Sequence, residues 1–275
     1  MPDQATLTPF VSAIIPSYNP DKGKLLMAVQ SLFDQTYPHL EVIICDDGSE
    51  FDVDNELRPL LPVLRNPANM TVEIIRNDQN LGISAARNKA IGVAKGKWLI
   101  WLDDDDQLGA DCLQILISKS DSRKMLIGEC VVDENRLIST RRPKSYWQDA
   151  KMYFRTERDP FLLNIISLQP QLILKEAFDH IGGFDENYRY AELTELFLRF
   201  LLAYGLEEVE FVDRATYYYN RNKPGSLTKH RAELMAFRKK ALLSYMCGIN
   251  VKADDISYVG RNEKTGMQMY KLLKS

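Results

Sequence analysis

The chain has 275 residues, of which 45% are hydrophobic and 27% are charged, so it can bury the core of a folded α/β protein and is not expected to be disordered. Its 35 basic and 38 acidic residues give a formal net charge of -3, which provides no overall field that would attract nucleic acid or an anionic membrane. The four cysteines form no CxxC pair, and we interpret them as reduced core residues.

The first residues of the chain are polar. Residues 1–9 contain no basic segment followed by an apolar stretch, so they do not resemble a secretory signal and predict a cytoplasmic protein. No apolar run approaches the roughly 20 residues that span a bilayer. We therefore expect membrane contact to be peripheral at most, at the inner face of the membrane.

The first part of the chain alternates between two kinds of apolar pattern. Short runs rich in β-branched residues predict buried strands, and stretches with helical spacing between them predict helices. The strands are expected at 11–15, 41–45, 71–75 and 97–102, and the helices at 25–33, 57–64 and 83–94. This alternation predicts right-handed βαβ crossovers and a Rossmann-like, mainly parallel sheet.

The rest of the chain is less regular. Strands are expected at 125–132, 171–174 and 209–212, and helices at 110–118, 192–204 and 231–246. The pattern predicts a mixed α+β half followed by a helical C-terminus. We expect one compact unit made of three segments, which are 1–108, 109–228 and 229–275.

Each of the first four strands runs into a polar loop. The loops are 16–20, 46–49, 77–82 and 103–106. Because ligands of open α/β sheets bind outside the carboxyl ends of the strands, these loops are expected to share one edge and one crevice.

The loop 103–106 consists of four consecutive aspartates after an apolar strand. Their mutual repulsion at a buried strand end is costly unless a cation compensates it, which favours a site for Mg²⁺ or Mn²⁺. The alternative is a solvated acidic turn that caps the next helix. The sequence run alone does not separate the two interpretations.

The other loops offer groups that suit a nucleotide. Asp46 and Asp47 can accept hydrogen bonds from a base or a ribose, although the same residues also suit a plain helix-entry turn. Arg87 can reach a phosphate or a base, or it can pair with an aspartate at the surface. Tyr18 can stack on a base and Asn19 can bond to it, or the two can form an ordinary turn. Their joint occurrence at four strand ends favours a ligand site.

These motifs resemble those of the family 2 glycosyltransferases, and the likeness is close over residues 10–109. The motifs that carry it are Pro16-Ser17-Tyr18-Asn19, Asp46-Asp47-Gly48-Ser49, Asn80-Leu81-Gly82, Ala86-Arg87-Asn88 and Leu102-Asp103-Asp104-Asp105-Asp106. A weaker likeness continues through 182–186 and 192–199. The resemblance implies the GT-A fold, with a nucleotide-sugar-binding half at 1–108, an acceptor-binding half at 109–228 and a C-terminal helical segment at 229–275.

The resemblance also implies a reaction. It implies a nucleotide-sugar donor, usually a UDP-sugar, a Mn²⁺ or Mg²⁺ ion, and displacement with inversion at the anomeric carbon. The acceptor would be a glycan, a lipid-linked saccharide or a protein side chain. Asp105, with Asp103, would hold the metal, and Asp103 would also face the ribose. The donor-binding residues would be Pro16, Tyr18, Asn19, Asp46, Asp47, Gly82, Arg87, Asp103, Asp104 and Lys223.

The sequence departs from the family pattern at the catalytic base. An acidic pair supplies the base in the family, but here Glu192 is followed by Leu193, which cannot accept a proton. We expect Glu192 to act as the base, with Asp185 and then Glu195 as the next candidates. The alternative is that Glu192 and Glu195 are solvent-facing residues on one helix face.

A second departure precedes Pro224-Gly225-Ser226. Many family members have a histidine there, whereas this chain has Lys223. Its ammonium group can neutralise the leaving diphosphate, or it can be an exposed turn lysine. The nearby Tyr217, Tyr218 and Tyr219 can form a sugar-stacking surface or belong to the core.

Two rival functions stay open. Leu193 motivates a nucleotide-sugar-binding module without catalysis. A nucleotidyltransferase would also use an acidic metal site, but it predicts a glycine-rich phosphate loop with a lysine after the first strand. Residues 16–24 supply no convincing loop of that kind.

Overall fold

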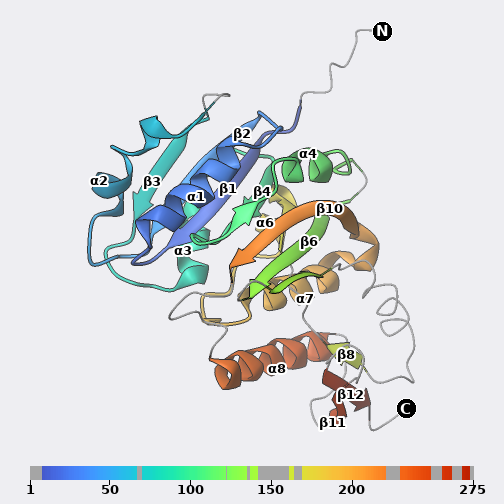
Figure 1. The fold of residues 1–275 in the computed structure, drawn as a ribbon. Coiled ribbons are helices and arrows are strands. Elements are labelled where there is room, and N and C mark those ends of the chain that lie inside the picture. The colour runs from blue at the N-terminus through green and yellow to red at the C-terminus, as the bar shows by residue number, and fades with distance from the viewer. Residues whose placement is uncertain are drawn as a thin grey trace, which may run out of the picture.

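The computed structural model describes residues 8–66, 70–121, 123–134, 137–141, 161–163, 169–220, 230–248, 256–261 and 268–272 (Figure 1). Its main feature is one large sheet in the order β3-β2-β1-β4-β9-β6-β10-β5, with β7 paired to β6. Helices cover both faces of this sheet. The arrangement agrees with the predicted α/β fold class.

The first half has the predicted strand and helix alternation. β1, β2, β3 and β4 are all parallel to their neighbours within this group. β1 and β2 are buried along their whole length, as is typical of central parallel strands. The elements are β1 (Val11–Ser17), α1 (Lys22–Phe33), β2 (Leu40–Asp46), β3 (Val72–Arg76), α3 (Ile83–Val93) and β4 (Trp98–Trp101).

The single helix predicted at 57–64 is wrong. The chain instead forms the short helix α2 (Val53–Leu57) and the 3-10 turn η1 (Leu61–Val63). Asp52 starts α2 earlier than predicted, because its side chain accepts a hydrogen bond from the Asn55 N–H at 3.1 Å. Pro59 then ends the helix, since a proline ring clashes with the preceding turn and has no N–H to donate.

The second half of the sheet is mixed, as predicted. β9 is antiparallel to both β4 and β6, whereas β6 and β10 are parallel to each other. The elements are β5 (Gln107–Leu108), α4 (Cys112–Ile117), β6 (Met125–Glu134), β7 (Leu137–Arg141), β9 (Gln171–Leu174), α6 (Lys175–His180), α7 (Glu192–Tyr204), η2 (Leu206–Glu208) and β10 (Val209–Asn220). The parallel pairing therefore dominates only in the first half.

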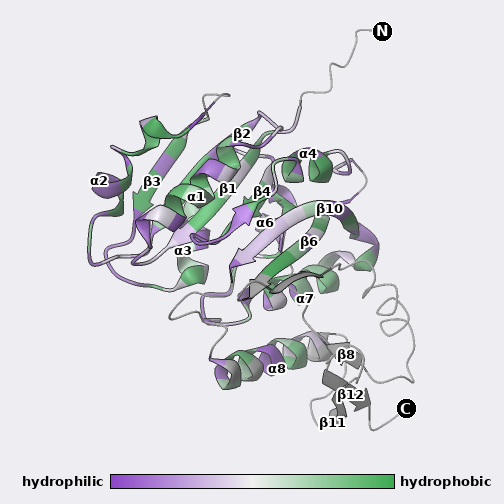
Figure 2. Ribbon diagram, viewed as in Figure 1, coloured by the Kyte–Doolittle hydropathy of each residue, from purple (hydrophilic) through white to green (hydrophobic). Residues whose placement is uncertain are grey.

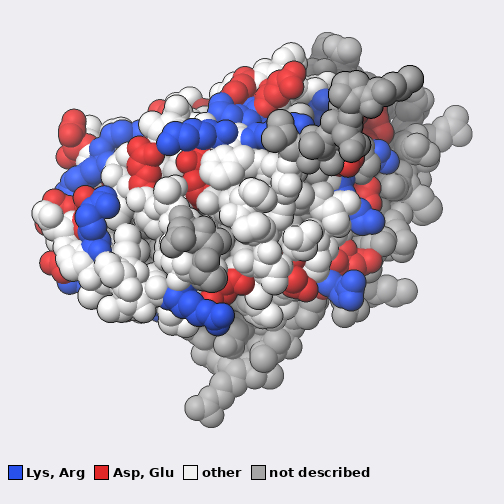
Figure 3. Space-filling model, turned by 90° about the horizontal axis from the view of Figure 1, so that it is seen from above, with Lys and Arg blue, Asp and Glu red and all other residues white. Residues whose placement is uncertain are grey.

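Two hydrophobic cores lie on the two faces of the sheet. α1 and α4 pack on the first core, and α3, α6, α7 and α8 (Arg231–Gly248) contribute to the second. The side chains of β4 show the division, since Ile100 belongs to the first core and Trp101 to the second. Figure 2 shows the hydrophobic character of the central strands, and Figure 3 shows acidic and basic side chains close together on one outer face.

The C-terminal part contains strands that the sequence did not predict. The predicted helix is present as α8, but β11 (Ile256–Arg261) and β12 (Gln268–Leu272) follow it, and β12 pairs with both β11 and β8 (Phe161–Leu163). The strand segments contain isoleucine, valine and tyrosine, which favour extended backbone, and their partner lies far away in the sequence. Within the described part of the chain, no helix is long and apolar enough to cross a bilayer.

β10 bends sharply where it passes Gly128 of β6. The register of the pair shifts between Phe211 and Thr216, and Arg214 within this bulge has a φ of 65°. A Cβ atom at Gly128 would lie 2.2 Å from the Ala215 carbonyl oxygen and 2.7 Å from Pro170 Cγ. The bend visible in Figure 1 therefore requires glycine at this position.

We expect Gly128→Ala to lower the free energy of unfolding by about 1–3 kcal/mol, the usual cost of overpacking, because backbone must move to admit the methyl group. Gly92→Ala is the matched control. Gly92 lies in α3 and has nothing within 4 Å of a Cβ atom, so this change should be neutral or stabilising by roughly 0.5–1 kcal/mol. Urea denaturation of both variants measures the difference. Equal stability of the two variants would contradict the proposed close approach.

Candidate active site

The four polar loops meet at one edge of the sheet, as the sequence predicts. The Ser17 carbonyl, at the end of β1, accepts a hydrogen bond from the Asp47 N–H at 2.7 Å. The Ser17 hydroxyl donates to Asp104 Oδ2 at 2.9 Å. Asn77, after β3, donates its side-chain amide to Asp47 Oδ1 at 2.7 Å. Direct bonds therefore join the carboxyl ends of all four parallel strands.

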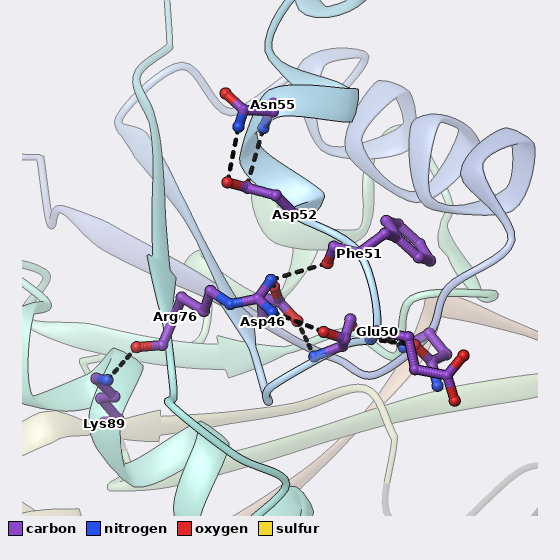
Figure 4. A network of polar contacts seen from close by, with 9 residues as sticks. Asp46, Glu50, Phe51, Asp52, Asn55, Arg76 and Lys89 are labelled. Carbon is purple, nitrogen blue, oxygen red and sulfur yellow. Dashed lines mark hydrogen bonds and ion pairs between the residues drawn. The ribbon is translucent and has the colours of Figure 1, made fainter.

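Asp46 is buried and organises the loop that follows β2. Its Oδ1 accepts the Ser49 N–H at 2.9 Å, and its Oδ2 is paired with the Arg76 guanidinium. Arg76 also donates to the carbonyls of Ser49 at 2.6 Å and Phe51 at 2.8 Å (Figure 4). Both oxygens of Asp46 are thus engaged inside the protein, and no motif in the sequence pointed to Arg76 as the partner of Oδ2.

Asp47 organises the loop that follows β3. Its carboxylate is 3% exposed and accepts the Leu81 N–H at 3.0 Å and the Gly82 N–H at 2.8 Å, in addition to the amide of Asn77. Gly82 has a φ of 98°, a conformation that glycine adopts without strain, and it leads directly into α3. Asp47 therefore fixes the entry of this helix.

The loop after β1 presents an aromatic side chain to solvent. Tyr18 is 45% exposed. Asn19 next to it is used internally, because its N–H donates to Ser49 Oγ at 2.8 Å and its Oδ1 accepts the Glu50 N–H at 2.8 Å. Pro16 lies within β1. Of the predicted donor residues in this loop, Tyr18 is the one with a free face for stacking.

The aspartate run is not a solvated helix cap. Asp104 and Asp106 are buried, with 6% and 1% exposure, whereas the side chain of Asp103 is 29% exposed and Asp105 is half-buried. The residues that follow form β5, and α4 starts only at Cys112. The run therefore alternates between inward and outward carboxylates, which rules out the alternative of an acidic cap.

Tyr217 of β10 holds the inward side of this run. The fully buried Tyr217 hydroxyl donates to Asp106 Oδ2 at 2.6 Å and accepts the Asp103 N–H at 3.2 Å. The Asn220 N–H donates to Asp106 Oδ1 at 2.7 Å. Tyr217 is therefore a core residue rather than part of a sugar-stacking surface. The tyrosine run gave no signal of this contact, which arises only from the fold.

Burial raises the pKa of Asp106 well above its usual value, and the charges of Asp103 and Asp105 raise it further. The hydrogen bonds from Tyr217 and Asn220 oppose this shift without cancelling it. Burial together with Asp103 and Asp106 also raises the pKa of Tyr217. Burial is therefore the main cause of both shifts, and the neighbouring carboxylates add to it.

Arg87 of α3 lies behind the aspartates and is fully buried. Its Nη2 donates to Asp103 Oδ1 at 2.8 Å and its Nη1 to Glu192 Oε1 at 2.8 Å. Burial alone would lower the pKa of the guanidinium, but the two carboxylates outweigh burial and raise it. Arg87 thus pairs with an aspartate, as one of the two interpretations proposed, but it does so in the interior and not at the surface.

The three candidate bases have different surroundings. Glu192 is the first residue of α7, is 13% exposed and contacts Arg87. Asp185 accepts hydrogen bonds from the backbone and side chain of Asn187, both at 2.9 Å, within its own loop. Glu195 is held by both of its oxygens in an ion pair with Arg199. Glu192 is therefore the candidate that is joined to the aspartate run.

The residue that follows Glu192 has a structural role. Leu193 is half-buried and packs against the second core. Lys223, predicted to contact the donor, lies outside the described residues, as does the whole of 221–229.

A divalent cation fits the chemistry of the aspartate run. Within the described residues, no group of three or more His, Cys, Asp or Glu side chains is arranged to hold a metal ion. Mg²⁺ and Mn²⁺ at phosphate sites need only one or two carboxylates, because phosphates and water complete the coordination. Asp103 and Asp105 are the outward members of the run. Burial is the main cause of the raised pKa of Asp106, and the charges of Asp103 and Asp105 add to it; a cation would offset this added charge effect.

We expect Asp106 to make stability fall with rising pH in metal-free buffer with EDTA. Its folded-state pKa lies above the unfolded value of about 3.9, so its favourable contribution is complete below roughly pH 4 and is lost as the pH rises through the folded pKa. Asp106→Asn removes the titration. The stability of the wild type relative to this variant should therefore decrease from about pH 4 upward.

Urea denaturation across the pH series measures this difference. A flat profile for Asp106→Asn would show that its burial has no net electrostatic cost.

Comparisons with known proteins agree with the arrangement of the loops. The profile described as Glycosyl transferase family 2 matches residues 12–182. The chondroitin synthase of Escherichia coli is 38% identical over 138 residues, which cover 50% of this chain and 19% of that protein. The Escherichia coli UDP-Glc:alpha-D-GlcNAc-diphosphoundecaprenol beta-1,3-glucosyltransferase WfaP is 35% identical over 99 residues, 35% of each chain.

A solved structure has the same fold. The crystal structure of S. aureus TarS residues 1–349 in complex with UDP superposes with a TM-score of 0.55 and 17% identity, covering 86% of this chain and 70% of that one. The chain spans less than a third of the length of the first curated relatives that it matches, with shares of 23%, 19% and 29%. The family profile covers more than half of this chain and includes the loops at all four strand ends. The chain belongs to glycosyl transferase family 2 and has the GT-A fold.

Proposed function

We propose that the protein transfers a sugar from a nucleoside diphosphate sugar, most simply a UDP-sugar, to an acceptor hydroxyl with inversion at the anomeric carbon. The observation that carries the proposal is that Arg87 joins Asp103, one of the two outward aspartates of the β4 loop, to Glu192. A donor held at the aspartates would then lie beside a carboxylate that can accept a proton. Family membership supports the same reaction class.

The donor would lie along the edge formed by the four loops. Tyr18 has the exposed ring face that a base needs for stacking. Asp46 and Asp47 act through the loops that they fix, together with Pro16, Asn19 and Gly82, so the edge is shaped before the donor arrives. Asp104 contributes in the same way by holding Ser17. The half-buried Asp103 and Asp105 face the donor directly.

A Mg²⁺ or Mn²⁺ ion held by Asp105, with Asp103, would neutralise the charge that develops on the diphosphate as it leaves. Lys223, which precedes the Pro-Gly-Ser segment, is proposed to assist at the same diphosphate. The chain's own contribution is to hold the outward carboxylates in place. Tyr217 fixes the Asp103 backbone and Arg87 fixes its side chain.

The transfer itself needs one proton acceptor. The acceptor oxygen forms a bond to the anomeric carbon from the face opposite the diphosphate, and the bond from that carbon to the phosphate oxygen breaks. The bonding electrons leave with UDP, and the hydroxyl proton passes to Glu192. Glu192 uses Oε1 for Arg87, which leaves Oε2 for this proton. Asp185 is a second candidate, in the same loop region that precedes α7.

The acceptor is proposed to be a glycan or a lipid-linked saccharide, with a protein side chain as a further possibility. The names of two relatives support the saccharide acceptors, since one is a chondroitin synthase and the other acts on a diphosphoundecaprenol-linked GlcNAc. A lipid-linked acceptor would bring the protein to the membrane surface from the cytoplasmic side. We propose that this contact is peripheral.

We expect UDP with Mn²⁺ to raise the thermal unfolding midpoint of the protein, because a ligand that binds only the folded state stabilises it. UDP-sugars would be screened in the same assay, and the best donor then tested for acceptor-dependent UDP release. Asp105→Asn should reduce the thermal shift, with an apparent affinity at least about 10-fold weaker, because it removes an outward carboxylate from the site. The rate of UDP release should fall by at least about 10-fold for the same reason.

The matched control is Asp121→Asn, which removes the same charge from an exposed turn and should leave both measurements unchanged. Absence of any thermal shift with nucleotides or nucleotide sugars would contradict the proposal. Donor binding without UDP release across oligosaccharide and polyprenyl-linked acceptors would instead support a binding module, the role that Leu193 motivates. Release of pyrophosphate from nucleoside triphosphates would point to a nucleotidyltransferase.

A further inference from the structure

α3 fastens the loop that precedes α7. The Ser84 hydroxyl donates to the Tyr188 carbonyl at 3.0 Å. The side-chain amide of Asn88 donates to the Phe184 carbonyl and accepts the Phe184 N–H, both at 2.9 Å. These two residues lie four apart on one face of the helix. A helix of the first half of the chain thus holds a loop of the second half in register.

Arg87 completes this contact from the same region of α3. Its two terminal nitrogens reach Asp103 and Glu192 at 2.8 Å each, and its Cζ lies 5.3 Å from the centre of the Phe184 ring. The three charged residues come from α3, the end of β4 and the start of α7. The planar guanidinium therefore sets the spacing between two carboxylates that no local chain geometry would bring together.

The start of α7 does not hold Glu192 by itself. Ala191, its N-cap, has a φ of 59°, a left-handed conformation that is unfavourable for a residue with a Cβ. The N-cap side chain makes no hydrogen bond to the first turn. A strained backbone persists only where its surroundings hold it. Here the contact between Glu192 and Arg87 supplies such a restraint.

We propose that Arg87 is a positioning residue that fixes the Glu192 carboxylate relative to Asp103, so that the proton acceptor is aligned by the donor side of the site. The catalytic part of this inference rests on the proposed function. The contacts of Arg87 with both carboxylates do not depend on any substrate. A lysine at this position carries the same charge but no rigid fork, so it cannot hold both carboxylates at a fixed spacing.

α7 offers a matched ion pair for comparison. Arg199 binds Glu195 at 2.8 and 2.6 Å and also donates to the Ile181 carbonyl. Its side chain is 26% exposed, and its ion pair is with Glu195. Arg199→Lys therefore disturbs a similar arginine-glutamate pair on the same helix without touching Asp103.

The kinetic test compares Arg87→Lys with Arg199→Lys. We expect Arg87→Lys to lower kcat by about 10- to 100-fold, because a small misplacement of a reacting group has a cost of this order. The donor KM should change by less than roughly 3-fold, since the outward face of Asp103 remains. Arg199→Lys should keep kcat near the wild-type value at equal folded fraction. An equal loss of kcat in the two variants would overturn the proposal. An effect of Arg87→Lys on KM alone, with kcat unchanged, would overturn it too.

The second test needs no turnover and separates this inference from the proposed function. Asp103→Asn and Glu192→Gln are combined in a double-mutant cycle of unfolding free energy, once with Arg87 and once with Arg87→Lys. The proposal expects clear non-additivity with Arg87 and near-additivity with lysine, because only arginine joins the two carboxylates. Additivity with Arg87 present would overturn the inference even in an active transferase. Non-additivity in a protein that never releases UDP would support the tie and reject the proposed function.

Discussion

The accumulation of negative charge at the end of β4 is the constraint on which this edge of the protein depends. Two of its four consecutive aspartates are buried, where an unpaired carboxylate is costly. The surrounding structure supplies hydrogen-bond donors or an ion-pair partner to individual aspartates of the run. The Tyr217 hydroxyl and the Asn220 N–H bond to Asp106, Ser17 bonds to Asp104, and Arg87 pairs with Asp103. The donors come from β10, β1 and α3, so the charge organises most of the sheet edge.

The sheet makes such an arrangement possible because its parallel strands all end at the same edge. The loops there are then held by carboxylates that turn inward. Asp46 fixes one loop with Arg76, and Asp47 fixes the next through the backbone of Leu81 and Gly82. These bonds exist in the free protein, so a ligand would meet a surface that is already ordered. Preorganisation of this kind reduces the entropy lost on binding.

The sequence predicted those parts of the structure that depend on local periodicity. The strands and helices of the first half, the shared edge and the aspartate loop follow from apolar spacing and from chain order. The break in the predicted helix 57–64 could also have been predicted, since Pro59 ends a helix for local reasons. The ion pair of Arg87 with Glu192 and the buried hydrogen bond of Tyr217 to Asp106 were not, because their partners lie 105 and 111 residues away. The same is true of the bulge that lets β10 pass Gly128.

The cluster of Arg87, Asp103 and Glu192 also restricts the order in which these positions can change during evolution. Loss of Glu192 first leaves a buried arginine that still has Asp103 as its partner. Loss of Arg87 first leaves two neighbouring carboxylates without a counter-charge, which is far more costly. Lineages that lose this cluster should therefore pass through neutral residues at 192 before they replace the arginine. Related sequences would then show correlated changes at positions 87 and 192, which are distant in the chain.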